Sequence, residues 1–490
     1  MKRKVSTFER LQSGKLRRKQ RKELARKLDS ENPQLEVVHR DAAGIDIGNE
    51  SHFVAVPTGR DEQAVREFGS WTADLRRMAE WLVGCGIRTV AMQSTGVYWI
   101  AAYDILREHG IEVYVVNAHG TKNLPGRKSD VQECQWLMKL HTYGLLRNSF
   151  QPSEEIGKIR TVWRVRDRHV KEAGRAVQHM QKALTKMNIQ LANAISDLSG
   201  VTGQKIIRAI VKGEREPRKL AELRHGTIQA SAEEIANSLQ GSWREDLLFE
   251  LEQALKDYDH ERKQMGACDE ELKKYLAAMP TRVVARDEEG ETKTAAPVEQ
   301  TRKRRRTKAR KARANQPEFD VTAELIRILG VDLTRIDGID VMTAQMVLSE
   351  VGPDLSAWKT EAQWASWLNL SPQREISGGK VIRHTRGPGA SRLGQAFRMA
   401  ASSLIRSDSY LGAQYRHLRA RLGGIKAVKA MARRLACLVY RLLTRGQAYV
   451  DRGVAHFEAK RQDRELNALK SKAAVHGMRL VPTGPTAGSY

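Results

Sequence analysis

Residues 42–150 alternate short apolar runs with amphipathic segments, and this alternation restricts the region to a layered fold of strands and helices. The segments AGIDIG and SHFVAVP, joined by GNE, are typical of a β-hairpin. Further strands and helices are expected, in chain order, at REFGSW, TADLRRMAEWLVG, RTVAMQSTG, YWIAAYDILREHG, EVYVVNA and SDVQECQWLMKLHTYG. Thr72 and Ser129 are expected to cap the helices that begin there. The pattern predicts an α/β domain.

Residues 151–280 show helical periodicity and no strand signals. Two long amphipathic helices are expected at RTVWRVRDRHVKEAGRAVQHMQKALTKMNIQL and EDLLFELEQALKDYDHERKQMGACDEELKKYLAAM, with shorter helices between them. Two such helices predict an antiparallel coiled-coil arm. Arms of this kind most often mediate dimerisation or span a partner.

The remaining segments differ sharply in composition. Residues 281–318 contain the basic block TRKRRRTKARKARA and few large apolar residues, which predicts a disordered linker able to bind nucleic acid. Residues 319–456 are apolar enough to form a second, mostly helical domain, with a loop-rich basic segment before one of its helices. A basic extension is expected over residues 1–41 and a flexible tail over residues 457–490.

The charge of the whole chain points to a polyanionic partner. Its 490 residues include 84 Lys and Arg against 58 Asp and Glu, a formal net charge of +26. Nucleic acid is the simplest polyanion for such a protein. The four cysteines lack the spacing of zinc or disulfide frameworks, and no apolar run is long enough to span a membrane. No phosphate-binding or dinucleotide-binding motif occurs, so neither ATP nor NAD is expected.

Four polar positions in the α/β region are candidate metal ligands. Asp46 lies within an apolar strand, where a carboxylate is costly unless it is paired or bound to a metal. Gln93 ends the fourth strand, and Asp130 and Glu133 lie three residues apart on one face of a helix. Acidic side chains at strand ends and on a facing helix can converge on Mg²⁺, which supports phosphodiester chemistry.

Several long strings resemble one known family. GIDIGNESHFVAVP, MQSTGVYWI and VYVVNAHGTKNLPGRKSDVQECQWLMKLHTYGLL are similar to the RuvC-like, RNase H-like domain of the DEDD insertion-sequence transposases. WLNLSPQREISGGKVIRHTRG and SRLGQAFRMAASSL resemble the second transposase domain of that family. These enzymes act with an element-encoded bridge RNA, also called seekRNA. The resemblance spans residues 42–455 and implies an α/β RuvC-like domain, a coiled-coil arm and a mostly α C-terminal domain.

The resemblance implies roles for the four candidate ligands. Asp46 matches the first acidic residue of the family pattern, and Asp130 and Glu133 match the last pair, with Glu133 standing where the family more usually has Asp. Gln93 stands where the family has Glu, and its uncharged carbonyl should hold Mg²⁺ more weakly than a carboxylate. The sequence leaves open whether this change is tolerated or lowers activity.

The resemblance also implies a nucleophile in the C-terminal domain. Ser377 matches the serine whose hydroxyl attacks a DNA phosphate and forms a covalent protein–DNA intermediate, and Ser371 is the second candidate. Glycines beside Ser377 permit close approach of a phosphate, and nearby cations neutralise it. The expected nucleic-acid-binding residues are Lys128, Arg374, Gly378, Gly379, Lys380, Arg383 and Arg386.

These expectations describe an RNA-guided DNA recombinase of a mobile element, located in the bacterial cytoplasm with the nucleoid. Its partners would be a guide RNA, donor DNA, target DNA and further copies of the chain, forming a dimer of dimers. Each composite site would combine a RuvC-like domain with a C-terminal domain from another protomer. Two alternatives stay open: a metal-dependent nuclease resembling a Holliday-junction resolvase that does not use Ser377, and a nucleic-acid-binding protein whose site has decayed.

Overall fold

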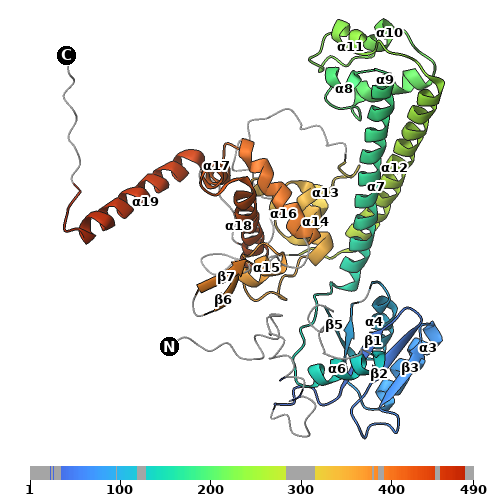
Figure 1. Ribbon diagram of the computed structural model, residues 1–490, viewed down its shortest axis with the longest axis vertical. Coiled ribbons are helices and arrows are strands. Elements are labelled where there is room, and N and C mark those ends of the chain that lie inside the picture. Colours follow the sequence, from blue (N-terminus) through green and yellow to red (C-terminus); the bar gives the residue numbers. More distant parts are fainter. Residues whose placement is uncertain are drawn as a thin grey trace. The chain divides into compact units, whose positions relative to one another are not determined.

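A computed structural model gives the structure of the chain as two compact units, Met1–Gln151 and Pro152–Tyr490 (Figure 1). It describes Glu23, Arg26 and residues 35–94, 96–117, 129–282, 315–372, 374–377, 380–384, 391–446 and 453–480. Between residues 374 and 384 the description covers the backbone. Most of the expected basic extension and linker therefore lies outside the described residues.

The first unit is built on a mixed five-stranded sheet with strand order β3-β2-β1-β4-β5. Its elements are β1 (Ala42–Ile47), β2 (Ser51–Ala55), β3 (Val65–Gly69), α3 (Thr72–Gly84), β4 (Thr89–Gln93), α4 (Trp99–Glu108), β5 (Glu112–Val116) and α6 (Asp130–Thr142). Strands β1, β2 and β3 pair antiparallel, whereas β4 and β5 continue the sheet parallel to β1. The hairpin followed by strand–helix alternation that the sequence predicts is confirmed.

One face of this sheet forms an apolar core with α3 and α4. Ile45 of β1 and Met92 of β4 are fully buried there beside Met78 of α3 and Leu106 of α4. Because successive side chains of a strand point to opposite faces, the residues between these apolar positions face the other side of the sheet. That side is covered by α6, which contacts β1, β2 and β4.

The helix boundaries test the capping expectations. Ser129 caps α6 as expected, since its hydroxyl accepts a hydrogen bond from the Gln132 backbone N–H. The expectation for Thr72 was wrong: Thr72 is the first helical residue of α3, Trp71 occupies the capping position, and no side chain accepts a capping bond there. A Thr beside a helix start can occupy either position, because capping depends on backbone dihedrals that the residue type does not determine.

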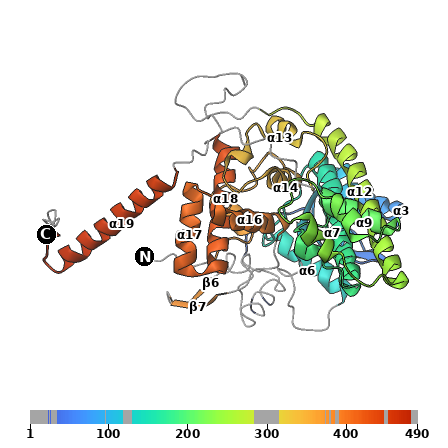
Figure 2. The same cartoon turned by 90° about the horizontal axis from the view of Figure 1, so that it is seen from above.

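The second unit begins with an arm of two long helices that lie side by side (Figures 1 and 2). Helix α7 has 33 residues and α12 has 34. The elements of the arm are α7 (Glu154–Lys186), α8 (Leu191–Ala194), α9 (Val201–Val211), α10 (Pro217–Glu222), α11 (Ala232–Ser238) and α12 (Glu245–Ala278). The helices are antiparallel, because Arg166 pairs with Asp269 while Lys186 pairs with Glu250. Two long helices with short ones between them are as the sequence predicts.

A buried ion pair joins the two long helices. The Arg166 Nε–Asp269 Oδ1 distance is 2.5 Å and the Arg166 Nη2–Asp269 Oδ2 distance is 3.2 Å, with side chains 1% and 4% exposed. Arg166 Nη1 also donates to the Asn315 carbonyl at 3.0 Å. The bidentate geometry satisfies two charges that would otherwise be very costly to bury.

The rest of the second unit is mostly helical. Its elements are α13 (Val321–Leu329), η1 (Leu333–Arg335), α14 (Val341–Val351), α15 (Glu361–Trp367), β6 (Arg374–Ser377), β7 (Lys380–His384), α16 (Arg392–Ser403), η2 (Leu404–Arg406), α17 (Tyr410–Leu422), α18 (Gly424–Arg445) and α19 (Gly453–Val475). Helix α14 packs against α7, and Glu350 of α14 forms ion pairs with Arg160 and Arg164 of α7.

Two elements of this region differ from expectation. The segment expected as a basic loop contains the hairpin β6–β7, and helix α19 occupies much of the expected tail. The two glycines between the strands and the charged residues within them favoured a loop. Helix α19 has a single described buried residue, Phe457, and thus a weak apolar pattern. In the described part of the chain, none of the helices is long and apolar enough to cross a membrane.

Candidate functional site

The carboxyl ends of β1 and β4 bring two of the expected site residues to one edge of the sheet. The parallel register pairs Gly44 with Ala91 and Ile45 with Met92, so Asp46 and Gln93 are the next neighbours along it. In open α/β sheets, ligands bind at this edge. Asp46 is half-buried and Gln93 is 4% exposed, so neither side chain is fully open to solvent.

Helix α6 approaches β1 so closely that Gly44 is required there. A Cβ atom at Gly44 would lie 2.2 Å from the Cys134 carbonyl oxygen and 2.3 Å from the Met138 backbone nitrogen. Neither backbone atom could move without displacing the helix. Because Gly44 and Asp46 point to the same face of β1, this contact places Asp46 beside the first turns of α6.

A hydrogen bond joins the end of β4 to α6. The Gln93 Nε2 amide donates to Glu133 Oε1 at 2.7 Å. Glu133 is half-buried and lies one turn after the helix start. The amide of Gln93 stabilises the negative charge of Glu133 by donating a hydrogen bond to it. A carboxylate in place of this amide would instead repel Glu133.

The pKa of the Cys134 thiol is affected by the carboxylates of the same region. Its thiol is buried and donates to the Val131 carbonyl at 3.1 Å. Burial, and then the negative charges of Asp46 and Asp130, raise the pKa of Cys134 to about 12. The two carboxylates, which come from β1 and from the exposed start of α6, therefore act on a single thiol.

The structure brings two of the four expected ligands into direct contact. Gln93 contacts Glu133 directly, and Asp46 and Asp130 both influence Cys134. Among the residues that the structure describes, no group of three or more His, Cys, Asp and Glu side chains is close enough to hold a metal ion. Asp46 and Gln93 end neighbouring strands and Gln93 contacts Glu133 of α6, but the described side chains do not form a compact acidic cluster.

The opposite end of α6 is held by an aromatic cluster. His141 Nε2 and Thr89 Oγ1 lie 2.9 Å apart, and the His141 ring stacks on His39 with a centroid distance of 4.6 Å. Burial, with a contribution from His39, lowers the pKa of His141 to about 3, so its imidazole is neutral. Because Thr89 begins β4 and Gln93 ends it, these contacts direct the N-terminus of α6 toward the carboxyl ends of the strands.

Ser377 lies in the other unit, as the last residue of β6. It pairs with Lys380 of β7, so two glycines separate the paired residues, and Arg374 pairs with His384. Arg383 lies on β7 opposite Glu375. Ser371 is half-buried just before the hairpin. Four expected nucleic-acid-binding residues lie outside the described residues: Lys128, Gly378, Gly379 and Arg386.

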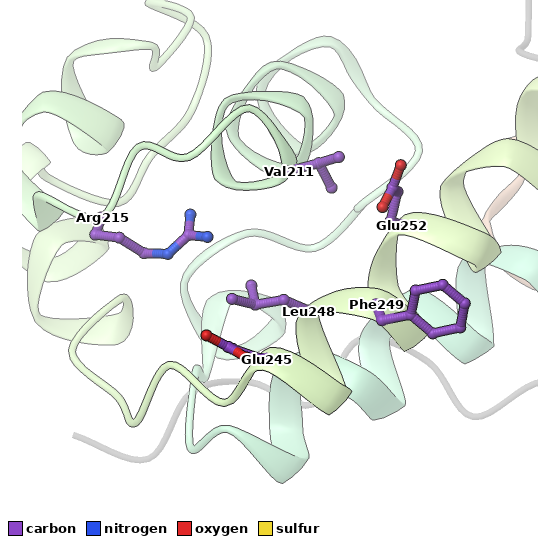
Figure 3. Close-up of a pocket in the computed structure, with 6 residues that line it drawn as sticks. All are labelled: Val211, Arg215, Glu245, Leu248, Phe249 and Glu252. Atoms are coloured by element: carbon purple, nitrogen blue, oxygen red, sulfur yellow. The ribbon is translucent and has the colours of Figure 1, made fainter.

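A cavity of about 230 Å³ lies in the arm, between the C-terminus of α9 and the N-terminal turns of α12 (Figure 3). It is lined by Val211, Arg215, Glu245, Leu248, Phe249 and Glu252. Arg215 donates to the carbonyls of Ile210 and Glu214, and its guanidinium lies 5.0 Å from the centre of the Trp243 ring. None of the expected site residues lines this cavity.

Sequence reasoning missed two residues of the site. Gly44 allows α6 to approach the sheet, and Cys134 lies under the influence of Asp46 and Asp130. A glycine two residues before Asp46, on the same face of the strand, was an available signal, since glycine within a strand often marks close backbone approach. No local signal singled out Cys134.

Comparison with known families finds matches in two separate regions of the chain. A DEDD transposase model of IS110 type matches residues 43–189, and a model of the Transposase IS116/IS110/IS902 family matches residues 332–416. No curated protein matches the chain. The two matches identify a transposase or recombinase of insertion sequences that acts on DNA. The chain belongs to the IS110-type DEDD transposase family.

Proposed function

We propose that this transposase is an RNA-guided DNA recombinase that uses acidic residues with Mg²⁺ and a serine nucleophile. The observation that carries the proposal is that Asp46 and Gln93 end neighbouring parallel strands, and that Gln93 contacts Glu133 in the first turn of α6. The two family matches, which cover the acidic site and Ser377 separately, support the division of the chemistry between two domains.

The strand order of the first unit supports the proposal that its fold is RNase H-like and RuvC-like. Its sheet begins with an antiparallel meander and continues with two parallel strands, in the order β3-β2-β1-β4-β5. The first acidic residue lies on the central strand β1, and α6 covers the face from which it projects. This arrangement places oxygen donors at the carboxyl ends of β1 and β4 and on the facing helix.

The donor set fits a hard divalent cation. Asp46, Asp130 and Glu133 offer carboxylate oxygens, and Gln93 offers an amide, the oxygen-rich chemistry that Mg²⁺ prefers. A bound cation would balance the negative charge of these three carboxylates. When bound, Mg²⁺ supplies charge neutralisation at the reacting phosphate. Gln93 positions Glu133 through the hydrogen bond at 2.7 Å.

Ser377 is the proposed nucleophile. Its hydroxyl oxygen would attack the phosphorus of a DNA strand, form a serine–phosphate ester and release the sugar oxygen of the broken bond. A serine hydroxyl is weakly nucleophilic unless its proton is removed and its target is held in line. Lys380, paired with Ser377 across the hairpin, and the neighbouring basic residues would balance charge on the phosphate.

The proposed partners are argued from the net charge of the chain and from the separation of the acidic residues and Ser377 in two domains. A net charge of +26 suits simultaneous binding of guide RNA, donor DNA and target DNA. Base pairing with a guide supplies sequence choice that backbone contacts do not. We propose that protomers assemble as a dimer of dimers, with each acidic site facing Ser377 of another protomer.

A covalent DNA adduct tests the serine mechanism. We expect wild-type protein, given its guide RNA and a nicked suicide DNA substrate, to form an adduct that peptide mass spectrometry locates at Ser377. Ser377→Ala should abolish the adduct while RNA binding is retained, because the substitution removes one hydroxyl group. The measurement is adduct yield on a denaturing gel.

Ser371→Ala is the matched control, because it removes a hydroxyl six residues away in the same segment. We expect this variant to form the adduct at the wild-type level. Mg²⁺-dependent cleavage by Ser377→Ala at the wild-type rate, without an adduct, would support the resolvase-like nuclease instead.

Gln93→Glu tests the metal site. The substitution replaces the amide donor to Glu133 by a carboxylate, so two negative charges would face each other and favour a bound cation. We expect the Mg²⁺ concentration for half-maximal activity to fall roughly tenfold. Gln93→Ala, which removes the amide without adding charge, should not lower it. An unchanged Mg²⁺ titration in Gln93→Glu would show that position 93 is not at the metal.

A further inference from the structure

The two long helices of the arm carry opposite net charges. Helix α7 contains nine Lys and Arg against four Asp and Glu, whereas α12 contains five against ten. At the far end of α12, Glu245 and Glu252 also line the cavity of Figure 3. A polyanion is therefore attracted to α7 and repelled by α12.

Four cations of α7 form one exposed line, which we name the basic stripe: Arg168, Lys171, Arg175 and Lys182. Their spacing of three, four and seven residues places them within an arc of about 60° around the helix and along about 21 Å of its axis. The side chains packed toward α12, including Ala173 and Met180, are buried on the opposite face. The stripe is thus a continuous edge of the arm.

Carboxylates flank the basic stripe without interrupting it. Within α7, which the structure describes throughout, no Asp or Glu lies inside the arc. Asp167 and Glu172 lie at its margins, where they pair with Lys171 at 2.6 Å and with Arg175 at 2.6 and 2.8 Å. Lys171 and Arg175 are 63% and 66% exposed, and solvent-exposed pairs of this kind are weak. A phosphate can replace such partners.

The beginning of the basic stripe lies beside the segment that follows Ser377. Arg392, the first residue of α16, reaches Asp167 with an Nη1–Oδ2 distance of 3.3 Å. Helix α16 follows the hairpin β6–β7 in the chain, and α14 also packs on α7. The start of α16 and helix α14 therefore both lie against α7 near the beginning of the stripe.

We propose that the basic stripe binds the phosphate backbone of a nucleic acid and guides it along the arm. Duplex DNA carries one phosphate per about 3.4 Å on each strand, so a line of about 21 Å faces several phosphates. Long Lys and Arg side chains at regular spacing recognise this repeating charge without reading sequence. The binding surface is independent of the chemistry at Ser377, since it needs neither the serine nor a metal.

The test is the triple variant Arg168→Gln, Arg175→Gln and Lys182→Gln in the full-length chain. We expect at least about a tenfold loss of affinity at 0.1 M salt and a log–log salt slope shallower by about 1 to 3, because each lost contact returns a condensed counterion. Fluorescence anisotropy with duplex DNA and with duplex RNA of the same sequence measures both quantities. The probe that responds more strongly identifies which backbone occupies the stripe.

The matched control is Lys256→Gln, Lys263→Gln and Lys274→Gln, which removes the same charge from exposed positions of α12. We expect this control to keep wild-type affinity and slope. Equal effects of the two triple variants on both probes would refute the stripe, because net charge alone would then explain binding. Loss of self-association in the stripe variant, with unchanged nucleic-acid binding, would also refute it and indicate a protein partner. Binding is measured without cleavage, so failure of the serine mechanism leaves this result unaffected.

Discussion

Ser377→Ala and Asp46→Ala are each expected to abolish strand transfer, by about four orders of magnitude or more, yet to recover part of it when mixed. Removing a nucleophile costs this much in other enzymes, and removing Asp46 takes away a ligand from the edge of the sheet. The proposed site takes its serine and its carboxylates from different protomers. Mixed oligomers therefore contain some sites in which both chains supply an unmutated residue. Recombination of a reporter DNA, measured across mixing ratios, gives the recovered fraction.

The control for this complementation is a chain that carries both substitutions. Mixed with Asp46→Ala, the double variant provides no intact carboxylate set and should recover nothing. Asp130→Ala should behave as Asp46→Ala does, and both should keep the wild-type fold, because removing one of several like charges relieves repulsion. Wild-type activity in Asp130→Ala would refute the site assignment, and complementation by the double variant would refute the composite site.

Asp269→Ala is expected to destabilise the arm by about 3 to 5 kcal/mol. The substitution leaves the Arg166 guanidinium buried between α7 and α12 without its carboxylate, although its contact with the Asn315 carbonyl is retained. Urea denaturation followed by circular dichroism should show a lower midpoint for the helical signal. Arg166→Met combined with Asp269→Leu should recover much of the loss, since two apolar side chains of similar size carry no charge to satisfy.

Asp259→Ala provides the matched comparison on the same helix. Asp259 pairs with Arg208 in an ion pair whose side chains are 46% and 42% exposed. Water can solvate both charges after the substitution, so we expect a change of about 1 kcal/mol or less. If Asp259→Ala and Asp269→Ala lowered the urea midpoint equally, the buried ion pair of Arg166 and Asp269 would contribute no more to the stability of the arm than an exposed pair.

The sequence by itself determined most of the local elements and the family to which the chain belongs. Alternating apolar residues specified strands β1 to β5, and helical periodicity specified the two long arm helices, because these patterns depend on neighbours within one or two turns. The motif strings around Asp46, Asp130 and Ser377 indicated the transposase family, which the family matches confirm. Short or exposed elements such as β6–β7 and α19 lacked such patterns and were not predicted.

Contacts between distant residues were decided by the tertiary structure. Gln93 and Glu133 are 40 residues apart and Arg166 and Asp269 are 103 apart, and no local pattern predicts that the two members of each pair form a hydrogen bond. The close approach at Gly44 likewise depends on where α6 crosses β1, about 90 residues later in the chain. Packing selects these partners because a buried polar group must find a complementary group nearby, and which groups lie nearby depends on how the helices and sheet come together.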